Sequence, residues 1–407
     1  MSSYLPRTLE KIFLKANGQF KALMISGMRQ VGKTTLLSHL KQSDRQFVSL
    51  DDLLELEDAR HQPTIFFRNH PLPLYLDEIQ RAPELFLPLK ATIDAQNETG
   101  VVWMTGSQRF RLMKNASESL VGRVIEFELM PFSIYEAQGL GLEQKAYVPT
   151  DKPHSLLTKH DRKATIKKMW QGLWPGAQRC EDADDWQLFY RSIVQTYLER
   201  DIRAELNIEK LAAFQLFLKA LALRSGQELR IGVLAQMSGV SEPTIKRWLS
   251  VAESSGLIYC LKPFYNNLSK QLVKSPKVYF TDVGLLCYLC GLHTPDDLEK
   301  YQDIGAVFET FVVSEILKSW VHNGKEAQLY FIRDSQTKEE IDLLIHANNT
   351  YHPVEIKWSE HPTSAMLKNF AMLSKQNLSV GLGSVICMTE KPRWLEENVI
   401  AHSIWEI

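Results

Sequence analysis

The sequence predicts an α/β protein whose first third forms a parallel β-sheet with helices on both faces. Short apolar runs alternate with helical stretches between residues 21 and 130, and a glycine-containing loop follows the first run directly. A second pair of strand-like runs occurs after residue 300. The strands expected in the first third are residues 21–26, 47–50, 74–77, 101–105 and 124–129.

Beyond this core, the pattern changes twice. Residues 135–225 have helical periodicity, with a polar connection near residues 149–160. Residues 228–283 predict a compact helix-turn-helix followed by strands, and the chain from about residue 300 predicts a helix, a strand pair and further α/β elements. The sequence thus predicts several domains in one chain.

The composition is that of an ordinary globular protein. The 407 residues include 47 Lys and Arg against 48 Asp and Glu, so any nucleic-acid contact requires a local basic surface. The first residues lack the blocks of a signal peptide, and no apolar run approaches the roughly 20 residues that span a bilayer. Five scattered cysteines favour free thiols in a reducing compartment. We therefore expect a cytoplasmic protein without membrane contact.

The loop after the first expected strand fits the pattern GxxxxGK[ST] completely. Glycines let backbone N–H groups curl around phosphates, and the helix that follows presents its positive end to them. We expect Lys33 to reach the β- and γ-phosphates and the Thr34 hydroxyl to ligate Mg²⁺. The sequence therefore predicts a site for ATP and Mg²⁺. The expected binding residues are Gly27, Met28, Arg29, Gln30, Val31, Gly32, Lys33, Thr34 and Thr35.

An acid pair, Asp77 and Glu78, ends the apolar run at residues 74–76. A buried strand that delivers two acids suits a Mg²⁺ site, with Asp77 in the shell of the ion and Glu78 polarising the attacking water. The alternative is a surface turn that is acidic by coincidence. A further strand ends near Thr105 and Ser107, either of which could sense the γ-phosphate, although a turn with a helix cap explains them as well.

Phosphoryl transfer also benefits from a cation on the transition-state oxygens. Arg123 precedes the last expected core strand, and Arg109 and Arg111 are near it in sequence. Arg123 is our candidate for this catalytic cation. The alternative is an ordinary solvated arginine.

Residues 234–249 read as two helices around a tight glycine turn, with Ser241 capping the second helix. The polar face of that helix carries Thr244, Lys246 and Arg247. The stretch from Lys262 to Lys277 adds four lysines and no acid. This pattern is typical of a recognition helix followed by a basic wing, so we expect DNA contact through residues 241–277. A helix-turn-helix used for packing or for protein contacts is the alternative.

Several charged residues of the C-terminal region belong together. Glu309 lies on an expected helix at residues 305–320, and Asp342 lies on an expected strand. Glu355 and Lys357 are two residues apart on the next strand, so they share a face. Two carboxylates and a lysine on adjacent strands suit Mg²⁺-dependent phosphodiester hydrolysis. This is the arrangement of the PD-(D/E)XK nuclease core, although any charged hairpin could contain the triplet.

Taken together, these motifs resemble the prokaryotic AAA-type P-loop ATPases whose C-terminal half is a domain of unknown function with a PD-(D/E)XK-like fold. The matching stretches cover most of the chain. They are GMRQVGKTTLL, LYLDEIQRAPELF, MTGSQ with SESLVGR, TYLERDIR, VSEPTIKRWLS, NNLSKQLVKSPKVYFTDVGLL, FETFVVSEI, and EEIDLLI with PVEIK.

The resemblance implies a P-loop NTPase core with the sensor strand between the strands of the phosphate loop and the acid pair, then a helical lid, a winged helix and a restriction-endonuclease-like α/β domain. The implied ranges are 1–135, 136–225, 226–292 and 293–407. It also implies that Asp342, Glu355, Glu309 and Lys357 occupy the nuclease-fold positions.

The expected function is Mg²⁺-dependent ATP hydrolysis by an ATPase that acts on or with DNA. The alternative is a regulatory nucleotide switch that binds protein partners and carries an inactive nuclease fold. Both readings allow assembly of identical chains into a homo-oligomer.

Overall fold

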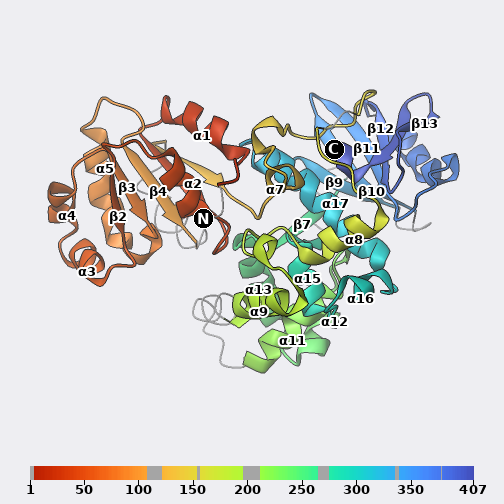
Figure 1. Cartoon of the computed structure of the whole chain (residues 1–407), viewed down its shortest axis with the longest axis horizontal. Coiled ribbons are helices and arrows are strands. Elements are labelled where there is room, and N and C mark those ends of the chain that lie inside the picture. Colours follow the sequence, from red (N-terminus) through yellow and green to blue (C-terminus); the bar gives the residue numbers. More distant parts are fainter. Residues whose placement is uncertain are drawn as a thin grey trace.

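A computed structural model describes residues 4–107, 122–153, 156–195, 211–264, 275–334, 339–376 and 378–407. The described chain forms two lobes (Figure 1). The first lobe contains the N-terminal parallel sheet and its helices. The second contains a group of helices beside a larger mixed sheet, which ends near the C-terminus.

The first lobe is built on a five-stranded parallel sheet in the order β2-β3-β4-β1-β5. The strands are β1 (Ala22–Ser26), β2 (Gln46–Ser49), β3 (Leu74–Asp77), β4 (Val102–Gly106) and β5 (Val124–Glu128). The helices are α1 (Leu9–Asn17), α2 (Lys33–Leu40), α3 (Leu53–His61), α4 (Pro63–Asn69) and α5 (Phe86–Asp94), with short 3₁₀ turns η1 (Ile79–Arg81) and η2 (Pro83–Leu85). Each predicted strand is confirmed to within one residue at either end. The predicted position of the sensor strand is confirmed as well, because β4 lies between β1 and β3.

Alternation along β1 explains why both faces of this sheet are covered. Leu23 and Ile25 join one apolar cluster with residues of α1 and α2, whereas Ala22 and Met24 join a second cluster with residues of α3, α4 and α5. Successive strand residues point to opposite faces, so every residue of β1 is buried on one side or the other. This double burial produces the continuously apolar runs of a covered parallel sheet.

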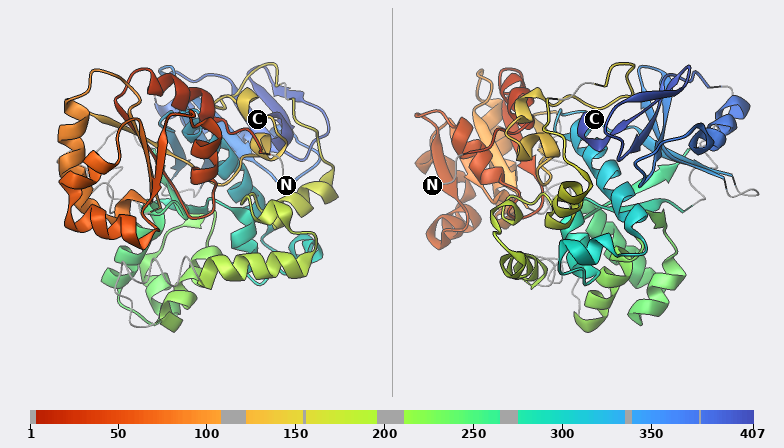
Figure 2. Two further views of the ribbon diagram at one scale, coloured as in Figure 1. Left: turned by 60° about the vertical axis from the view of Figure 1, so that its left-hand side comes forward. Right: turned by 45° about the vertical axis from the view of Figure 1, so that its right-hand side comes forward.

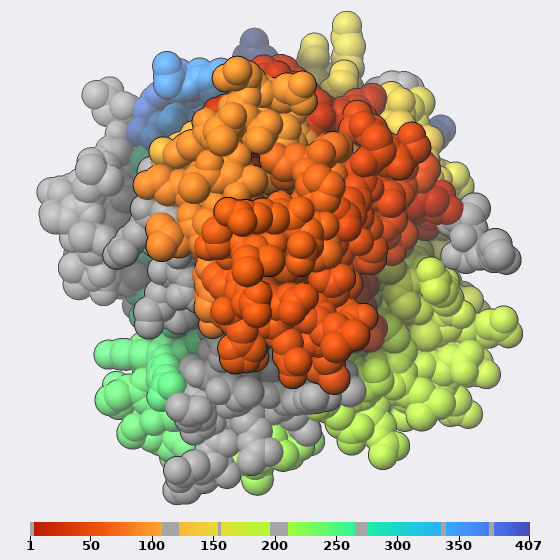
Figure 3. Space-filling view, turned by 90° about the vertical axis from the view of Figure 1, so that its left-hand side faces the viewer, coloured from red at the N-terminus to blue at the C-terminus, as the bar shows by residue number. Residues whose placement is uncertain are grey.

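The second lobe contains a group of helices and the long helix α17, and Figure 2 shows this lobe from two further sides. Its helices are α7 (Ile134–Ala137), α8 (Arg162–Gln171), α9 (Ala183–Ser192), α11 (Leu211–Ala222), α12 (Ile231–Ser238), α13 (Glu242–Ser254), α15 (Val283–Leu289), α16 (Pro295–Glu299) and α17 (Ile304–Val321). The 3₁₀ segments are the short turns η3 (Gly141–Glu143), η4 (Ala177–Arg179) and η7 (Ile404–Glu406) and the longer η6 (Ser364–Gln376). Seen from the side of the first lobe, the helical region extends below that lobe (Figure 3).

Nine strands of the second lobe form one mixed sheet in the order β13-β14-β12-β11-β10-β9-β7-β8-β6. They are β6 (Gln227–Glu228), β7 (Ile258–Pro263), β8 (Lys277–Phe280), β9 (Leu329–Arg333), β10 (Glu340–Ala347), β11 (Thr350–Ile356), β12 (Gly383–Cys387), β13 (Arg393–Glu396) and β14 (Val399–Ser403). β7 pairs in parallel with β9, with Lys262 opposite Tyr330 and Pro263 opposite Phe331. The boundary expected at residue 292 therefore does not separate two sheets.

The predicted helix-turn-helix is present as α12 and α13, joined by a turn in which Gly239 adopts a left-handed conformation (φ +65°). Trp248 of α13 packs edge-on against Phe214 and Phe217 of α11, with ring centroids 5.2 and 5.3 Å apart. Ser241 is the N-cap residue of α13, but its hydroxyl contacts the Thr244 hydroxyl rather than a backbone N–H. The predicted side-chain cap is thus wrong in detail. None of the described helices is both long enough and apolar enough to cross a membrane.

Candidate functional site

The carboxyl edge of the first sheet brings most of the predicted nucleotide-site residues together. Parallel strands end at the same edge, so the loop after β1, the acid pair at the end of β3 and Ser107 after β4 become neighbours. Hydrogen bonds connect these three segments directly. The site is therefore assembled by the sheet rather than by contacts close in sequence.

The phosphate loop needs glycine at two positions. Gly27 has φ +147°, and a Cβ there would lie 2.1 Å from the Leu129 carbonyl oxygen. Gly32 has φ +97° and is the N-cap residue of α2. Lys33 Nζ donates to the carbonyl oxygens of Gly27 (2.9 Å) and Met28 (2.8 Å), so its ammonium lies over the loop. Val31 is buried, whereas Arg29, Gln30 and Thr35 are exposed.

Burial sets the protonation of Lys33, whose side chain is 5% exposed. Burial lowers the pKa of Lys33 to about 8, although the carboxylates of Glu78 and Asp77 act in the opposite direction. The ammonium therefore has few competing solvent contacts, and a bound polyphosphate would favour its charged form.

Asp77 is held by three hydroxyl groups. Its Oδ1 accepts hydrogen bonds from Thr34 Oγ1 (3.0 Å), Tyr75 Oη (3.1 Å) and Thr105 Oγ1. Burial and the charge of Asp77 raise the pKa of Tyr75 well above its usual value, so the phenol stays a donor. Thr34 and Asp77 thus lie together as the expected ligands of Mg²⁺ require.

Glu78 is fixed by neighbours from two segments. Its backbone is left-handed (φ +58°), and its Oε2 accepts hydrogen bonds from Ser107 Oγ (3.2 Å) and Gln80 Nε2. Gln80 Nε2 also donates to Ser107 Oγ at 3.0 Å. Thr105 and Ser107, the two candidates for sensing the γ-phosphate, each donate a hydrogen bond to one of the two acids. The polar end of β4 thus orients the acid pair.

The residues present fit Mg²⁺. The ion prefers oxygen ligands and keeps several waters, so one carboxylate and one hydroxyl beside the phosphates of a nucleotide satisfy it. Asp77 and Thr34 supply these two oxygens at hydrogen-bonding distance from each other.

Arg123, the candidate for the catalytic cation, does not lie in the nucleotide site of its own chain. Arg123 precedes β5, so it lies at the amino edge of the parallel sheet, opposite the phosphate loop. Its guanidinium pairs with Asp94 at the end of α5, with Nε 2.6 Å from Oδ1 and Nη2 3.0 Å from Oδ2. The predicted strand next to Arg123 is present as β5, but Arg123 lies at the amino end of that strand. Arg109 and Arg111 lie outside the described residues.

The C-terminal carboxylates point to one face of the second sheet, as predicted. Lys357 Nζ lies 3.2 Å from Asp342 Oδ2 and 2.6 Å from Glu355 Oε1, so a single cation reaches both acids. Burial and the nearby Asp342 carboxylate raise the pKa of Glu355 to about 8, although Lys357 opposes them. Within the described part of the chain, no group donates a hydrogen bond to Glu355 Oε2.

Glu309 does not join these two acids as a third ligand, contrary to our expectation. Its Oε1 accepts hydrogen bonds from Lys277 Nζ (2.5 Å) and Tyr279 Oη (2.6 Å). Lys277 Nζ also lies 2.8 Å from Glu340 Oε1. Across the described ranges, no three His, Cys, Asp or Glu side chains form a group that could hold a metal ion.

The position of Lys277 contradicts the prediction that this lysine belongs to an exposed basic wing. Its side chain is only 4% exposed, and burial alone would lower its pKa, but Glu309 and other nearby charges raise it well above the usual value. It cannot contact a DNA phosphate from this position. Lys246, Arg247 and Lys262 are exposed and Thr244 is partly buried, whereas Lys270 and Lys274 fall outside the described residues.

Four residues have roles in these sites that the sequence did not predict. The roles of Tyr75 and Lys277 could have been predicted, because residues two apart on a strand share a face. Tyr75 lies on the same face of its strand as Asp77, and Lys277 lies on the same face as Tyr279. No comparable signal marked Gln80, which lies two residues after the left-handed Glu78, or Arg7, which contacts the phosphate loop from before α1.

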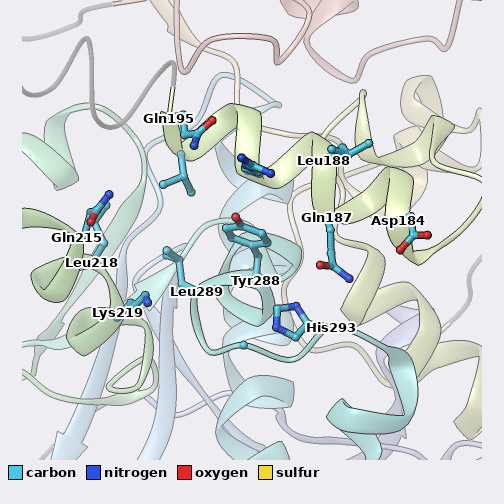
Figure 4. A pocket seen from close by; sticks show the side chains of 13 residues that line it. Asp184, Gln187, Leu188, Gln195, Gln215, Leu218, Lys219, Tyr288, Leu289 and His293 are labelled. Atoms are coloured by element: carbon cyan, nitrogen blue, oxygen red, sulfur yellow. The ribbon is translucent and has the colours of Figure 1, made fainter. Parts of the chain in front are cut away.

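A separate hollow of about 630 Å³ lies between α9, α11 and the end of α15 (Figure 4). Gln187, Gln195 and Tyr288 border it, together with Lys219 and His293. None of the residues predicted from the sequence lines this hollow, so it is distinct from both sites above.

Comparison with known proteins agrees with the geometry of the first lobe. Residues 19–138 match the model of a family described as an AAA domain. Residues 162–296 and 304–407 match models of two domains of unknown function, DUF8612 and DUF4143.

Two related sequences align with most of this chain. Uncharacterised proteins of Mycobacterium tuberculosis and Mycobacterium bovis are each 27% identical over 356 residues, which covers 87% of this chain and 74% of theirs. Among solved structures, a Walker-type ATPase of Pyrococcus abyssi superposes with a TM-score of 0.46 at 14% identity, covering 69% of this chain and 94% of that one.

The first lobe therefore has a parallel-sheet core like that of P-loop ATPases, and residues 19–138 match an AAA domain. The two remaining matches carry no assigned activity.

Proposed function

We propose that this protein binds ATP with Mg²⁺ and hydrolyses it at the carboxyl edge of the first sheet. The observation that carries the proposal is the contact between Thr34 Oγ1 and Asp77 Oδ1 at 3.0 Å, directly beside the buried ammonium of Lys33. A P-loop site needs these groups together, because one pair holds the metal and the lysine neutralises the phosphates.

Each residue has a defined task in this proposal. Thr34 and Asp77 would hold Mg²⁺, which would supply positive charge beside the phosphates. Lys33 pairs with the phosphate oxygens, and Glu78 orients the attacking water. Ser107 and Gln80 hold the Glu78 carboxylate in place.

Two substitutions separate binding from hydrolysis. Lys33→Ala removes the charge that pairs with phosphate, and we expect ATP affinity to fall by at least about 100-fold. Glu78→Gln keeps that charge, so we expect near-normal binding with turnover reduced by roughly 100- to 1000-fold. Calorimetry measures binding and phosphate release measures turnover.

Lys41→Ala is the matched control, since Lys41 is an exposed lysine at the other end of the same helix. It should bind and hydrolyse ATP like the wild type. Wild-type turnover in Glu78→Gln would remove that residue from the mechanism.

We also propose that the second lobe associates with DNA. The support is the exposed polar face of α13, which presents Lys246 and Arg247 away from the apolar contacts of Trp248. Lys262 adds a third exposed cation on β7. Such cations contribute to affinity by neutralising phosphates.

A nuclease-like site at Asp342 and Glu355 is the second candidate function. The buried Glu355 Oε2 without a donor fits a cation ligand, and Mg²⁺ commonly uses one or two protein carboxylates together with substrate oxygens. Such an ion would supply charge on a phosphodiester and on its attacking water. The rival reading treats Lys277 and Lys357 as permanent counter-ions of an inactive nuclease fold in a nucleotide-dependent switch.

Cleavage of mixed DNA substrates with Mg²⁺ or Mn²⁺ decides between these readings. An active site predicts metal-dependent cleavage that disappears in Asp342→Ala and in Lys357→Ala. Glu396→Gln, which alters an exposed carboxyl on the same sheet, should leave cleavage intact. Absence of cleavage in the wild type would favour the switch, and cleavage that survives both substitutions would come from a contaminant.

A further inference from the structure

Two carbonyl groups of the phosphate loop are held by side chains from outside the loop. Trp174 Nε1 donates to the Arg29 carbonyl oxygen at 3.0 Å, and Arg7 Nη1 donates to the Val31 carbonyl oxygen at 2.7 Å. Trp174 is fully buried and Arg7 is 2% exposed. One donor follows α8 in the second lobe and the other precedes α1, so the loop is held by two segments that are remote in sequence.

The geometry of the peptide unit gives these contacts a functional meaning. In a trans peptide, the carbonyl of one residue and the N–H of the next point in opposite directions. A hydrogen bond that draws the Arg29 carbonyl toward Trp174 therefore turns the N–H of Gln30 away from Trp174. In the same way, the bond from Arg7 to the Val31 carbonyl turns the N–H of Gly32 away from Arg7.

We propose that Arg7 and Trp174 are positioning residues that aim the N–H groups of Gln30 and Gly32 at the phosphates of a bound nucleotide. The inference rests on the ATP site proposed above and names two residues that set its geometry. Neither of them needs to contact the nucleotide itself. They act through the loop backbone.

The conformation between the two clamped carbonyls supports this role. Gln30 has φ +61°, a left-handed conformation that side chains other than glycine adopt at a cost. A loop with this residue at its apex has other backbone conformations of lower local energy. Hydrogen bonds on both sides of Gln30 oppose those alternatives.

Arg7 is itself fixed firmly enough to act as a clamp. Its Nη2 donates to the Met130 carbonyl oxygen at 2.7 Å, and its Nε lies 3.0 Å from Glu136 Oε1. Glu136 Oε1 also accepts from the backbone N–H of Thr8 at 2.9 Å and lies 3.2 Å from His322 Nδ1. The clamp is therefore anchored in the segment that joins the two lobes.

Loss of either hydrogen bond should weaken nucleotide binding because it destabilises the binding-competent conformation of the loop in the free protein. A loop released from its clamps spends part of its time in conformations that cannot bind, and the apparent affinity falls by the fraction that remains competent. Once nucleotide is bound, the phosphates hold the loop. We therefore expect KM to rise while kcat changes little.

Matched substitutions test this inference. Trp174→Phe removes the indole N–H and keeps an aromatic ring. Its control is Trp186→Phe, because Trp186 is also fully buried and its Nε1 donates to a backbone carbonyl, that of Trp170, at 3.1 Å. Arg7→Ala is compared with Arg45→Ala, since Arg45 is a buried arginine that donates to the Gly100 carbonyl oxygen at 2.7 Å, remote from the phosphate loop.

Dissociation constants for ATP and ADP are measured below the unfolding temperature of every variant, together with kcat and KM. We expect Trp174→Phe to raise both dissociation constants and KM by about three- to tenfold, and Arg7→Ala by more than about tenfold. Both controls should keep wild-type affinity even where their thermal stability falls. If Arg7→Ala does not fold, the comparison of Trp174→Phe with Trp186→Phe still tests the inference.

Two outcomes would overturn the inference, and they differ. Wild-type binding with Trp174→Phe within twofold of Trp186→Phe would refute the clamp and leave the ATP site intact. Absence of ATP and ADP binding in the wild-type chain would refute the proposed function and the clamp together.

Discussion

Lys33 reaches two carbonyl groups of its own loop with a side chain that is almost completely buried. An ammonium in this position is solvated by backbone oxygens rather than by water. Burial lowers its pKa to about 8, so its charge changes within a pH range where the protein can be studied. A nucleotide that pairs with Lys33 favours the protonated form, and binding is therefore linked to proton uptake.

This linkage predicts the pH dependence of ATP binding. Below pH 8, free Lys33 already carries its proton and binding takes up little. Above pH 8, the free side chain is neutral while the bound one is charged, so each binding event takes up one proton and affinity falls toward tenfold per pH unit. Calorimetry in buffers of different ionisation enthalpy measures this uptake at pH 6.5 and pH 9.

Glu78→Gln provides an internal check. The Glu78 carboxylate opposes the lowering of the Lys33 pKa, so its neutralisation should move the onset of proton uptake to lower pH. An affinity that does not change between pH 7 and pH 9.5 would show that Lys33 keeps its proton in the free protein.

At the scale of elements, helix α13 has one buried apolar face and one exposed charged face. Ile245, Trp248 and Leu249 are buried, whereas Lys246 and Arg247 between them are exposed. The 3.6-residue period of a helix produces this division directly from the sequence. The exposed pair can therefore be changed without loss of the core contacts of Trp248 with α11.

Replacement of both exposed residues tests the proposed DNA contact. If each cation neutralises one phosphate, Lys246→Ala with Arg247→Ala should flatten the dependence of log K on log salt concentration by about 1.8 for duplex DNA. The loss should be similar for unrelated sequences, because phosphate contacts carry no base information. Fluorescence anisotropy at several salt concentrations measures the slope.

The control removes the same amount of charge from a different surface. Lys163 and Lys167 are exposed on α8, and their double replacement by alanine should leave the slope unchanged. Equal slopes for the wild type and the α13 variant would instead favour protein contact through α13.

At the scale of the whole molecule, the two lobes are joined through polar contacts to a short connecting segment. The N–H of Leu129 donates to Ser26 in the first lobe (2.8 Å), and the N–H of Ile134 donates to Glu315 of α17 (2.7 Å). Lys318 donates to the Phe132 carbonyl oxygen at 3.1 Å. One continuous apolar cluster also extends from Leu9 to Trp405. The lobes thus share a core.

The sequence predicted the features that depend on local pattern. The strands and helices, and the pairing of Asp342 with Glu355 around Lys357, follow from residue spacing along one or two elements. Contacts between distant segments were not open to this reasoning. Arg7 donates a hydrogen bond to Met130, which is 123 positions away in the sequence. The parallel pairing of β7 with β9 involves two residue pairs that no sequence pattern distinguishes. Lys277 was misjudged because a lysine near a predicted wing is usually exposed.

The pairing of β7 with β9 has a consequence for dividing the chain into fragments. A fragment that stops at residue 292 would uncover the edge of β7 and remove Glu309 and Glu340 from the buried ammonium of Lys277. An uncovered strand edge invites pairing with another chain, and an ammonium without its counter-ions disfavours the folded state. The helix-turn-helix should therefore be expressed together with the C-terminal strands, as one piece of roughly the last half of the protein.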